Sequence, residues 1–119
     1  MDLIKQALAA REYPVQIGEV TFTLRRMTTL DWLRRSSANL DAAIETAVGW
    51  KGVTEAAFLP SGGSDAVPFS GAAMVLYVGD RPELWKPLEE AFVKAHETHA
   101  ERLGALRKNS PRTSDGSES

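Results

Sequence analysis

Alternating apolar and polar positions characterise the segment from Tyr13 to Arg26. The apolar positions are Val15, Ile17, Val20, Phe22 and Leu24, most of them β-branched or aromatic. A period of two is typical of a β-strand, and Gly18-Glu19 interrupts it as a two-residue hairpin turn would. The pattern predicts a hairpin in which Pro14–Ile17 pairs with Val20–Arg25. Because a lone hairpin is not stable in water, its apolar face must pack on helices or on another subunit.

Helical spacing is the main pattern in the rest of the chain. We expect a short helix over Asp2–Ala10 and a long one over Thr28–Val48, where Thr28 and Asp31 have the spacing of a capping box. The predicted buried stripe of the long helix is Leu30, Leu33, Ser37, Leu40, Ile44, Ala47 and Val48. Ser36–Asn39 has low helix propensity, so a bend or a split of this helix at that stretch is one alternative.

Three short anchors lie between the later helices, namely Gly49–Val53, Val67–Ser70 and Asp80–Leu84. Trp50 and Phe69 are predicted to fill the core at corners of the chain, since large aromatic side chains dominate core energetics. Pro68 keeps the residue before it extended, and Ser70 is placed to cap the next helix. Pro82 is tolerated in the first turn of a helix. These anchors predict helices folded back on one another.

The last helical region spans Asp80–Lys108. Asp80 and Glu83 have capping-box spacing, and Pro87 predicts either a kink or a fresh helix that begins at Pro87. The expected apolar stripe is Leu88, Ala91, Phe92, Ala95, His99, Leu103 and Leu106. The prediction is thus an α+β fold, mainly α, in which an N-terminal β-hairpin is followed by a small bundle of helices.

Composition limits the protein class. The chain has 119 residues, of which 43% are hydrophobic and 25% charged, as in a soluble globular domain. We expect one domain over residues 1–108 and a disordered tail over 109–119, because the tail has no apolar residue to bury. Cysteine is absent, which excludes disulfides and thiolate metal sites. Neither a signal peptide nor a membrane span is expected, so the predicted compartment is the cytoplasm.

Catalytic chemistry is not predicted. His96-Glu97-Thr98-His99 resembles a zinc protease helix, but its histidines are three residues apart, whereas that motif needs four. We expect His99 to be partly buried on the apolar stripe, with His96 at its edge. Gly62-Gly63 lacks the following lysine and the preceding strand of a phosphate-binding loop. We therefore expect no catalytic residue, no cofactor and no metal.

The basic residues form one cluster, composed of Arg25, Arg26, Arg34 and Arg35. One interpretation is contact with nucleic-acid phosphates. The other is a solvated face that pairs with the nearby acids Glu12, Glu19 and Asp31. The formal net charge of −2 and the lack of interleaved aromatic residues favour the second.

Trp32 is the second candidate binding feature. It falls about 100° off the predicted stripe of its helix, on the flank next to Arg35. It either packs under the hairpin or remains exposed. Exposed tryptophan and arginine are the residues most often found as interface anchors. If exposed, Trp32 and Arg35 would form a face for self-association or for a partner.

Several of these segments, in this order, resemble the small tail assembly chaperones of long-tailed bacteriophages and prophages. The segments are a hairpin running into Phe22-Thr23-Leu24-Arg25-Arg26-Met27-Thr28, then Val48-Gly49-Trp50-Lys51-Gly52-Val53, Val67-Pro68-Phe69-Ser70 and Asp80-Arg81-Pro82-Glu83-Leu84. The resemblance covers roughly residues 15–108. It departs from the family pattern in the helix before the hairpin and in Pro87.

The resemblance implies a non-catalytic protein of the bacterial host cytoplasm. Such chaperones bind the helical tape measure protein before the tube polymerises and are absent from the finished particle. The tail tube protein is a second candidate partner. Weak self-association would let many copies cover one extended partner. A longer form made by frameshifting is common in that family. The alternatives are a structural virion component, such as a connector or tail-completion protein, and a small nucleic-acid-binding regulator that uses the arginine cluster.

Overall fold

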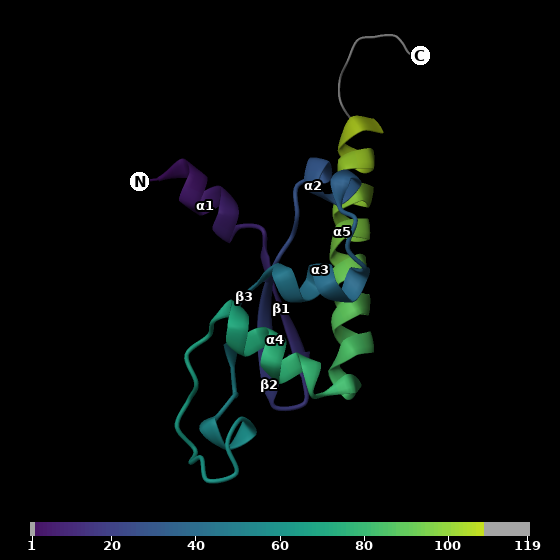
Figure 1. Ribbon diagram of the computed structural model, residues 1–119. Coiled ribbons are helices and arrows are strands. Elements are labelled where there is room, and N and C mark those ends of the chain that lie inside the picture. The colour runs from purple at the N-terminus through teal and green to yellow at the C-terminus, as the bar shows by residue number, and fades with distance from the viewer. Residues whose placement is uncertain (1, 109–119) are drawn as a thin grey trace.

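A computed structural model describes residues 2–108 and shows an α+β fold that is mainly helical (Figure 1). The predicted tail over 109–119 lies outside the described residues. The helices are α1 (Leu3–Ala9), α2 (Thr29–Arg34), α3 (Asn39–Glu45), α4 (Gly71–Gly79) and α5 (Trp85–Lys108), with 3-10 turns η1 (Glu55–Ala57) and η2 (Pro82–Leu84). The strands are β1 (Glu12–Ile17), β2 (Val20–Arg25) and β3 (Ala47–Lys51), in the order β1-β2-β3.

The predicted hairpin is confirmed. β1 and β2 are antiparallel, and Ile17 pairs with Val20 across the two-residue turn. Gly18 in that turn has a φ of 63°, a left-handed conformation that glycine adopts without steric cost. Pro14 lies in β1, an edge strand, where the absence of an N–H is tolerated.

The prediction of one long helix over Thr28–Val48 is wrong in its last part. Ala47–Lys51 forms β3, which pairs antiparallel with β2 and places Trp50 opposite Phe22. The uncharged part of this segment, residues 47–50, is too short for its spacing to distinguish a helix from a strand. Strand β2 already had one partner in β1, and pairing with β3 satisfies the polar groups along its other edge.

The first part of that segment splits, as the low propensity of Ser36–Asn39 allowed. Helix α2 ends at Arg34, and α3 begins at Asn39 after an extended Ala38. The predicted stripe is wrong at its start, because Leu30 is 53% and Leu33 74% exposed. The fully buried residues of α3 are instead alanines, Ala42 and Ala43. Their small side chains let α3 pack closely on α5.

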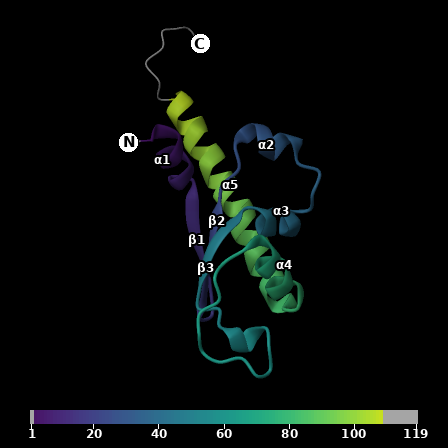
Figure 2. The same cartoon turned by 60° about the vertical axis from the view of Figure 1, so that its left-hand side comes forward.

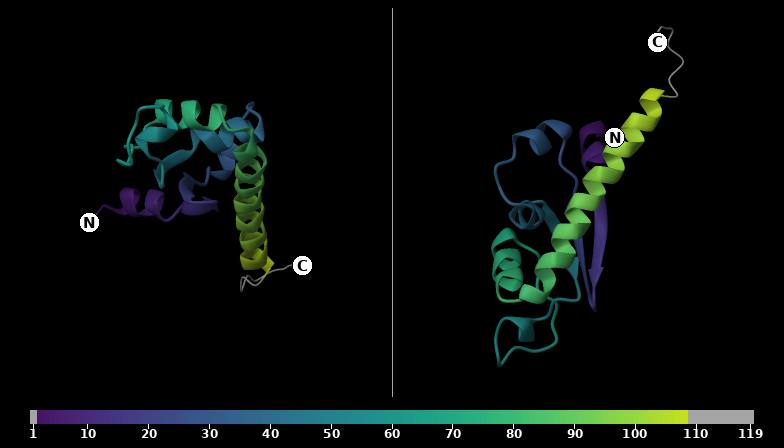
Figure 3. Two further views of the ribbon diagram at one scale, coloured as in Figure 1. Left: turned by 90° about the horizontal axis from the view of Figure 1, so that it is seen from below. Right: turned by 90° about the vertical axis from the view of Figure 1, so that its right-hand side faces the viewer.

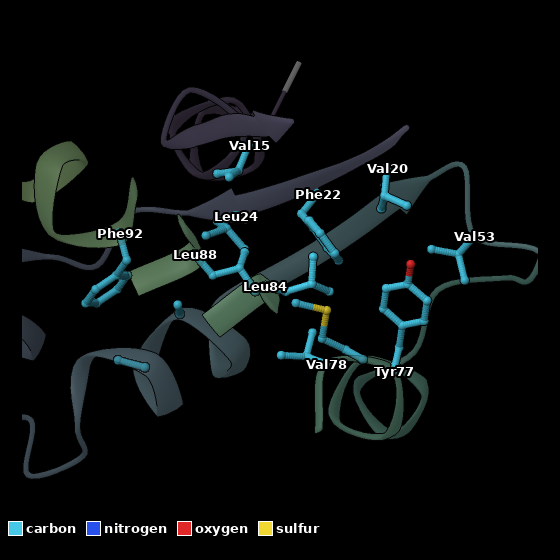
Figure 4. Close-up of a cluster of buried hydrophobic side chains, with 13 residues drawn as sticks. Val15, Val20, Phe22, Leu24, Val53, Tyr77, Val78, Leu84, Leu88 and Phe92 are labelled. Atoms are coloured by element: carbon cyan, nitrogen blue, oxygen red, sulfur yellow. The ribbon is translucent and has the colours of Figure 1, made fainter. Parts of the chain in front are cut away.

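Helices α3, α4 and α5 enclose the core together with the sheet (Figures 2 and 3). Strand β2 supplies its alternate residues to this core, and Figure 4 shows Phe22 and Leu24 directed toward the side chains of the helices. The helical residues that meet them are Met74, Tyr77, Val78, Leu84, Leu88 and Phe92. Helix α1, by contrast, stands apart from α5 in Figure 1 and buries no side chain.

The helix caps follow the sequence prediction at two sites. The Thr28 Oγ1 accepts a hydrogen bond of 3.1 Å from the Asp31 N–H, and the Ser70 Oγ accepts one of 3.1 Å from the Ala73 N–H. The capping box predicted from Asp80 and Glu83 is wrong. Asp80 is the C-cap residue that follows α4, and the N-cap of the next element is Arg81.

The two prolines of the last helical region fit the first turns. Pro82 is the first residue of η2, whose N-cap is Arg81 and lacks a side-chain cap. Helix α5 begins at Trp85, two residues before the predicted restart, and continues to Lys108. Pro87 is its third residue. The first four N–H groups of a helix have no partner within it, so Pro87 costs no hydrogen bond.

Trp50 and Phe69 pack together against the core, but both are only partly buried, so the prediction that they fill the core is met only in part. Their ring centroids are 5.2 Å apart and nearly perpendicular, and Trp50 also contacts Phe58 and Tyr77. The Trp50 Nε1–H donates a hydrogen bond of 2.8 Å to the Val67 carbonyl. Val67 is the residue before Pro68, so this hydrogen bond connects the Val67–Ser70 anchor to strand β3.

Within residues 2–108, no helix combines the length and apolar character needed to span a bilayer.

Candidate functional site

Trp32 packs on α5 and not under the hairpin. Its ring stacks on the His96 imidazole, with centroids 4.5 Å apart and planes 19° from parallel. The centroids of the Trp32 and Phe92 rings are 5.7 Å apart. The Arg35 guanidinium lies 4.1 Å from the centre of the Trp32 ring, which places a cation over an aromatic face. Trp32 is therefore half-buried, with contacts on α5 and with Arg35.

His99 is partly buried, as predicted, whereas the buried histidine of α5 is His96, which was predicted at the edge of the apolar stripe. It is 7% exposed, and both ring nitrogens have backbone partners. The Nε2 accepts a hydrogen bond of 2.9 Å from the Met27 N–H. The Nδ1 lies 2.8 Å from the Phe92 carbonyl oxygen. An N–H can only donate and a carbonyl can only accept, so His96 is neutral with its proton on Nδ1.

This bonding pattern opposes protonation of His96. A second proton would lie on Nε2 and face the Met27 N–H. Burial lowers the pKa of His96 below its usual value of 6.5, and the charges of Arg26, Arg35 and Arg11 lower it further, against the opposite effect of the Phe92 carbonyl. The imidazole thus joins the end of β2 to α5 only in its neutral form.

We expect the stability of the protein to fall as the pH falls from about 7 to 5. The unfolded state takes up the His96 proton at higher pH than the folded state, so the unfolding free energy declines below the unfolded pKa. Urea titrations across this range measure it. The unfolding free energy of the His96→Asn variant should depend less on pH than that of the wild type. The His99→Asn control should retain the pH dependence that His96 causes. Equal slopes in the two variants would contradict this role.

Trp32→Ala is expected to lower the unfolding free energy by about 2 kcal/mol, because truncation of a half-buried ring costs less than truncation of a fully buried one. Leu33→Ala, one residue away at an exposed position, should change it by no more than about 0.5 kcal/mol. Thermal and urea unfolding measure both. If Trp32→Ala keeps the stability and self-association or partner binding weakens, the ring is an interface anchor instead.

The arginine cluster is real and larger than predicted. Arg25, Arg26, Arg34 and Arg35 line one open hollow of about 560 Å³, together with Arg11. Arg11 and Arg26 also line a second hollow of about 370 Å³ between β1 and α5, which adds Lys94 and Arg102. We call the first the arginine hollow, and we call all the cations of the two hollows the basic band: Arg11, Arg25, Arg26, Arg34, Arg35, Lys94 and Arg102.

Little of the charge of the basic band is neutralised by nearby acids. Of the predicted pairs, Arg25 and Glu12 are 3.1 Å apart, the one ion pair among the side chains of residues 2–106. Burial lowers the pKa of the Arg26 guanidinium, and repulsion from Arg11 and Arg102 adds to the effect. Half of the fourteen lysine and arginine residues of a chain with net charge −2 thus lie in this band.

Arg11 has a structural role within the basic band. Its Nε donates a hydrogen bond of 2.9 Å to the Arg26 carbonyl, and its Nη2 donates one of 2.5 Å to the Met27 carbonyl. The Arg11 carbonyl in turn accepts from the Arg26 N–H. Arg11 was missed from the sequence because it lies fourteen residues before the other arginines. The hairpin register places Arg11 opposite Arg26. Extending the predicted strand pairing to Arg26 would therefore have added Arg11 to the cluster.

Large apolar side chains are exposed on three helices, α1, α2 and α4. On α1, Leu3 is 74% and Ile4 67% exposed, and Leu8 is exposed at the edge of the arginine hollow. Leu30 and Leu33 are exposed on α2, and so are Val75 and Leu76 on α4. Single exposed apolar residues are ordinary. A helix such as α1 that leaves all its large apolar residues uncovered is not.

The remaining motifs do not form sites in the described part of the chain. Gly62 packs against the backbone of Glu55, where a Cβ would come within 2.5 Å of the carbonyl carbon and oxygen, so it serves the turn. No group of three histidine, cysteine, aspartate or glutamate side chains within residues 2–108 is placed to hold a metal ion. Comparison of the chain with protein-family models, curated proteins and solved structures finds no match.

Proposed function

We propose that this protein is a phage tail assembly chaperone that binds helical segments of the tape measure protein through uncovered helix faces. The observation that carries the proposal is α1, seven residues long, with its leucine and isoleucine side chains in solvent. An isolated helix of this length is marginal in water. Docking of an apolar partner would bury this face and stabilise α1. The order of segments that resembles the tail chaperones supports the same role.

Co-expression tests this function directly. A tape measure protein encoded in the same genome should remain soluble with the chaperone and aggregate without it. A variant with Leu3 and Leu8 both replaced by serine should lose most of this effect and still fold, because neither side chain is buried in the monomer. Unchanged solubility of the tape measure protein with and without the chaperone would refute the proposal.

Mass spectrometry of purified phage particles distinguishes a structural virion component from a chaperone, because a chaperone should be missing from the particles.

The basic band favours a second function, nucleic-acid binding by Arg25, Arg26, Arg34 and Arg35. That function predicts affinity for nucleic acid that falls steeply with salt. Unchanged mobility of DNA and RNA at low salt would exclude it.

A further inference from the structure

We propose that the arginine hollow and α1 form one docking surface for an acidic amphipathic helix, and that this surface selects the partner segments. The inference rests on the proposed function and adds the chemistry of the partner. That segment carries carboxylate side chains toward the arginines and apolar side chains toward α1. Neither the uncovered leucines nor the arginines alone would specify such a segment.

The charge of the hollow is the first support. Five arginines line it, against two carboxylates, Asp31 and Glu45. Only one of the five, Arg25, has an ion-pair partner among the side chains of residues 2–106. Arg34 is exposed and makes no side-chain hydrogen bond to the described chain. Guanidinium groups bind carboxylates through two parallel hydrogen bonds, so the free donors match aspartate and glutamate side chains.

The apolar part of the lining is the second support. Leu8, Met27 and Val48 line the same hollow as the arginines. Leu8 is on α1, which also leaves Ile4 and Leu3 exposed. The basic and apolar parts therefore meet at Leu8. A ligand with both characters would cover them at once, as an amphipathic helix does with an apolar stripe flanked by charged positions.

Nucleic acid fits this lining less well than a protein helix. The hollow has no aromatic side chain on which a base could stack, and its apolar residues Leu8, Met27 and Val48 have no counterpart on a phosphate backbone. The volume of about 560 Å³ holds a few side chains, whereas a whole helix is about 10–12 Å wide. The partner helix would thus lie across the rim and insert side chains between α1 and α2.

A pair of synthetic peptides tests this inference with the full-length chain. Each is an amphipathic helix of about 20 residues, roughly 30 Å long, with leucine along one stripe and either glutamate or glutamine beside it. We expect the glutamate peptide to bind at least about tenfold more tightly at low salt, and the difference to shrink as salt is raised. Fluorescence anisotropy of labelled peptides measures both. Equal affinity of the two peptides would overturn the inference.

Matched variants locate the surface. Arg25→Glu combined with Arg34→Glu should weaken binding of the glutamate peptide about tenfold or more and leave the glutamine peptide unchanged. Arg34→Gln alone should give a smaller loss in the same direction. Because Arg34 is exposed and makes no side-chain hydrogen bond or ion pair in the described chain, this variant shows whether a loss in the double variant comes from misfolding. Lys86→Glu, an exposed position outside both hollows, is the charge control. An equal loss in Lys86→Glu would contradict this surface.

The outcomes for this inference and for the chaperone function are distinct. If the tape measure protein stays soluble equally well with wild-type chaperone and with the double arginine variant, the chaperone function stands and the acidic-helix surface is refuted. If co-expression gives no solubility while the glutamate peptide binds as expected, the surface stands and the tape measure partner is wrong. Stronger binding of single-stranded DNA than of the glutamate peptide, lost in the same double variant, would replace the inference by nucleic-acid recognition.

Discussion

Gly52→Ala is expected to lower the unfolding free energy by about 3 kcal/mol or more, from two causes that add. Gly52 has a φ of 91°, a conformation that residues with a Cβ rarely adopt and that costs about 1–2 kcal/mol. A Cβ at this position would also lie 2.3 Å from the Glu19 carbonyl oxygen. That oxygen belongs to the backbone of the hairpin turn, so β3 or the turn must move.

Two other glycines provide matched controls for this result. Gly18→Ala meets no neighbouring atom but has a φ of 63°, so it should cost about 1 kcal/mol. Gly63→Ala has open space and no positive φ, and should be close to neutral. Urea unfolding of the three variants measures the series. A cost for Gly52→Ala no larger than for Gly18→Ala would show that the backbone of Glu19 is not held against Gly52.

Trp50→Ala is expected to cost about 3 kcal/mol, the lower end for truncation of a large aromatic side chain, because the ring is only partly buried. The loss includes the ring contacts with Phe58, Phe69 and Tyr77. It also includes the hydrogen bond to the Val67 carbonyl, which would be left without this donor.

Trp50→Phe separates these contributions. It keeps most of the ring packing and removes the indole N–H, so it should cost about 1 kcal/mol, the size of one net hydrogen bond. Thermal and urea unfolding measure both variants. A near-neutral Trp50→Ala with weakened partner binding would move Trp50 from the core to a binding surface.

Either loss would be a large share of the stability of a small domain, which is typically about 5–15 kcal/mol. The two sites lie at the same edge of the sheet. Trp50 and Gly52 flank Lys51, and Lys51 pairs with Thr21 in β2. The segment after β3 therefore depends on one side-chain anchor and one close backbone approach.

The sequence alone determined the features that depend on neighbouring residues. The alternation over Val15–Leu24 with Gly18 in its middle specified the hairpin and its register, because side-chain direction in a strand repeats every two residues. Thr28 and Ser70 marked helix starts, since a cap needs only its own hydroxyl and an N–H three residues on. The size of Trp50 and Phe69 indicated that both pack against the core, although the sequence did not show that they remain partly buried.

The tertiary structure decided the features that depend on distant residues. Ala47–Lys51 became a strand because the open edge of β2 was available to it, which no local period reveals. Trp32, and not Leu30 or Leu33, faces α5 because the chain turns between α2 and α3. His96 is buried because the free N–H of Met27, 69 residues away, meets its ring. The hairpin register and the path of α5 likewise bring Arg11 and Arg102 to the basic band, since only the folded chain sets distances between such remote cations.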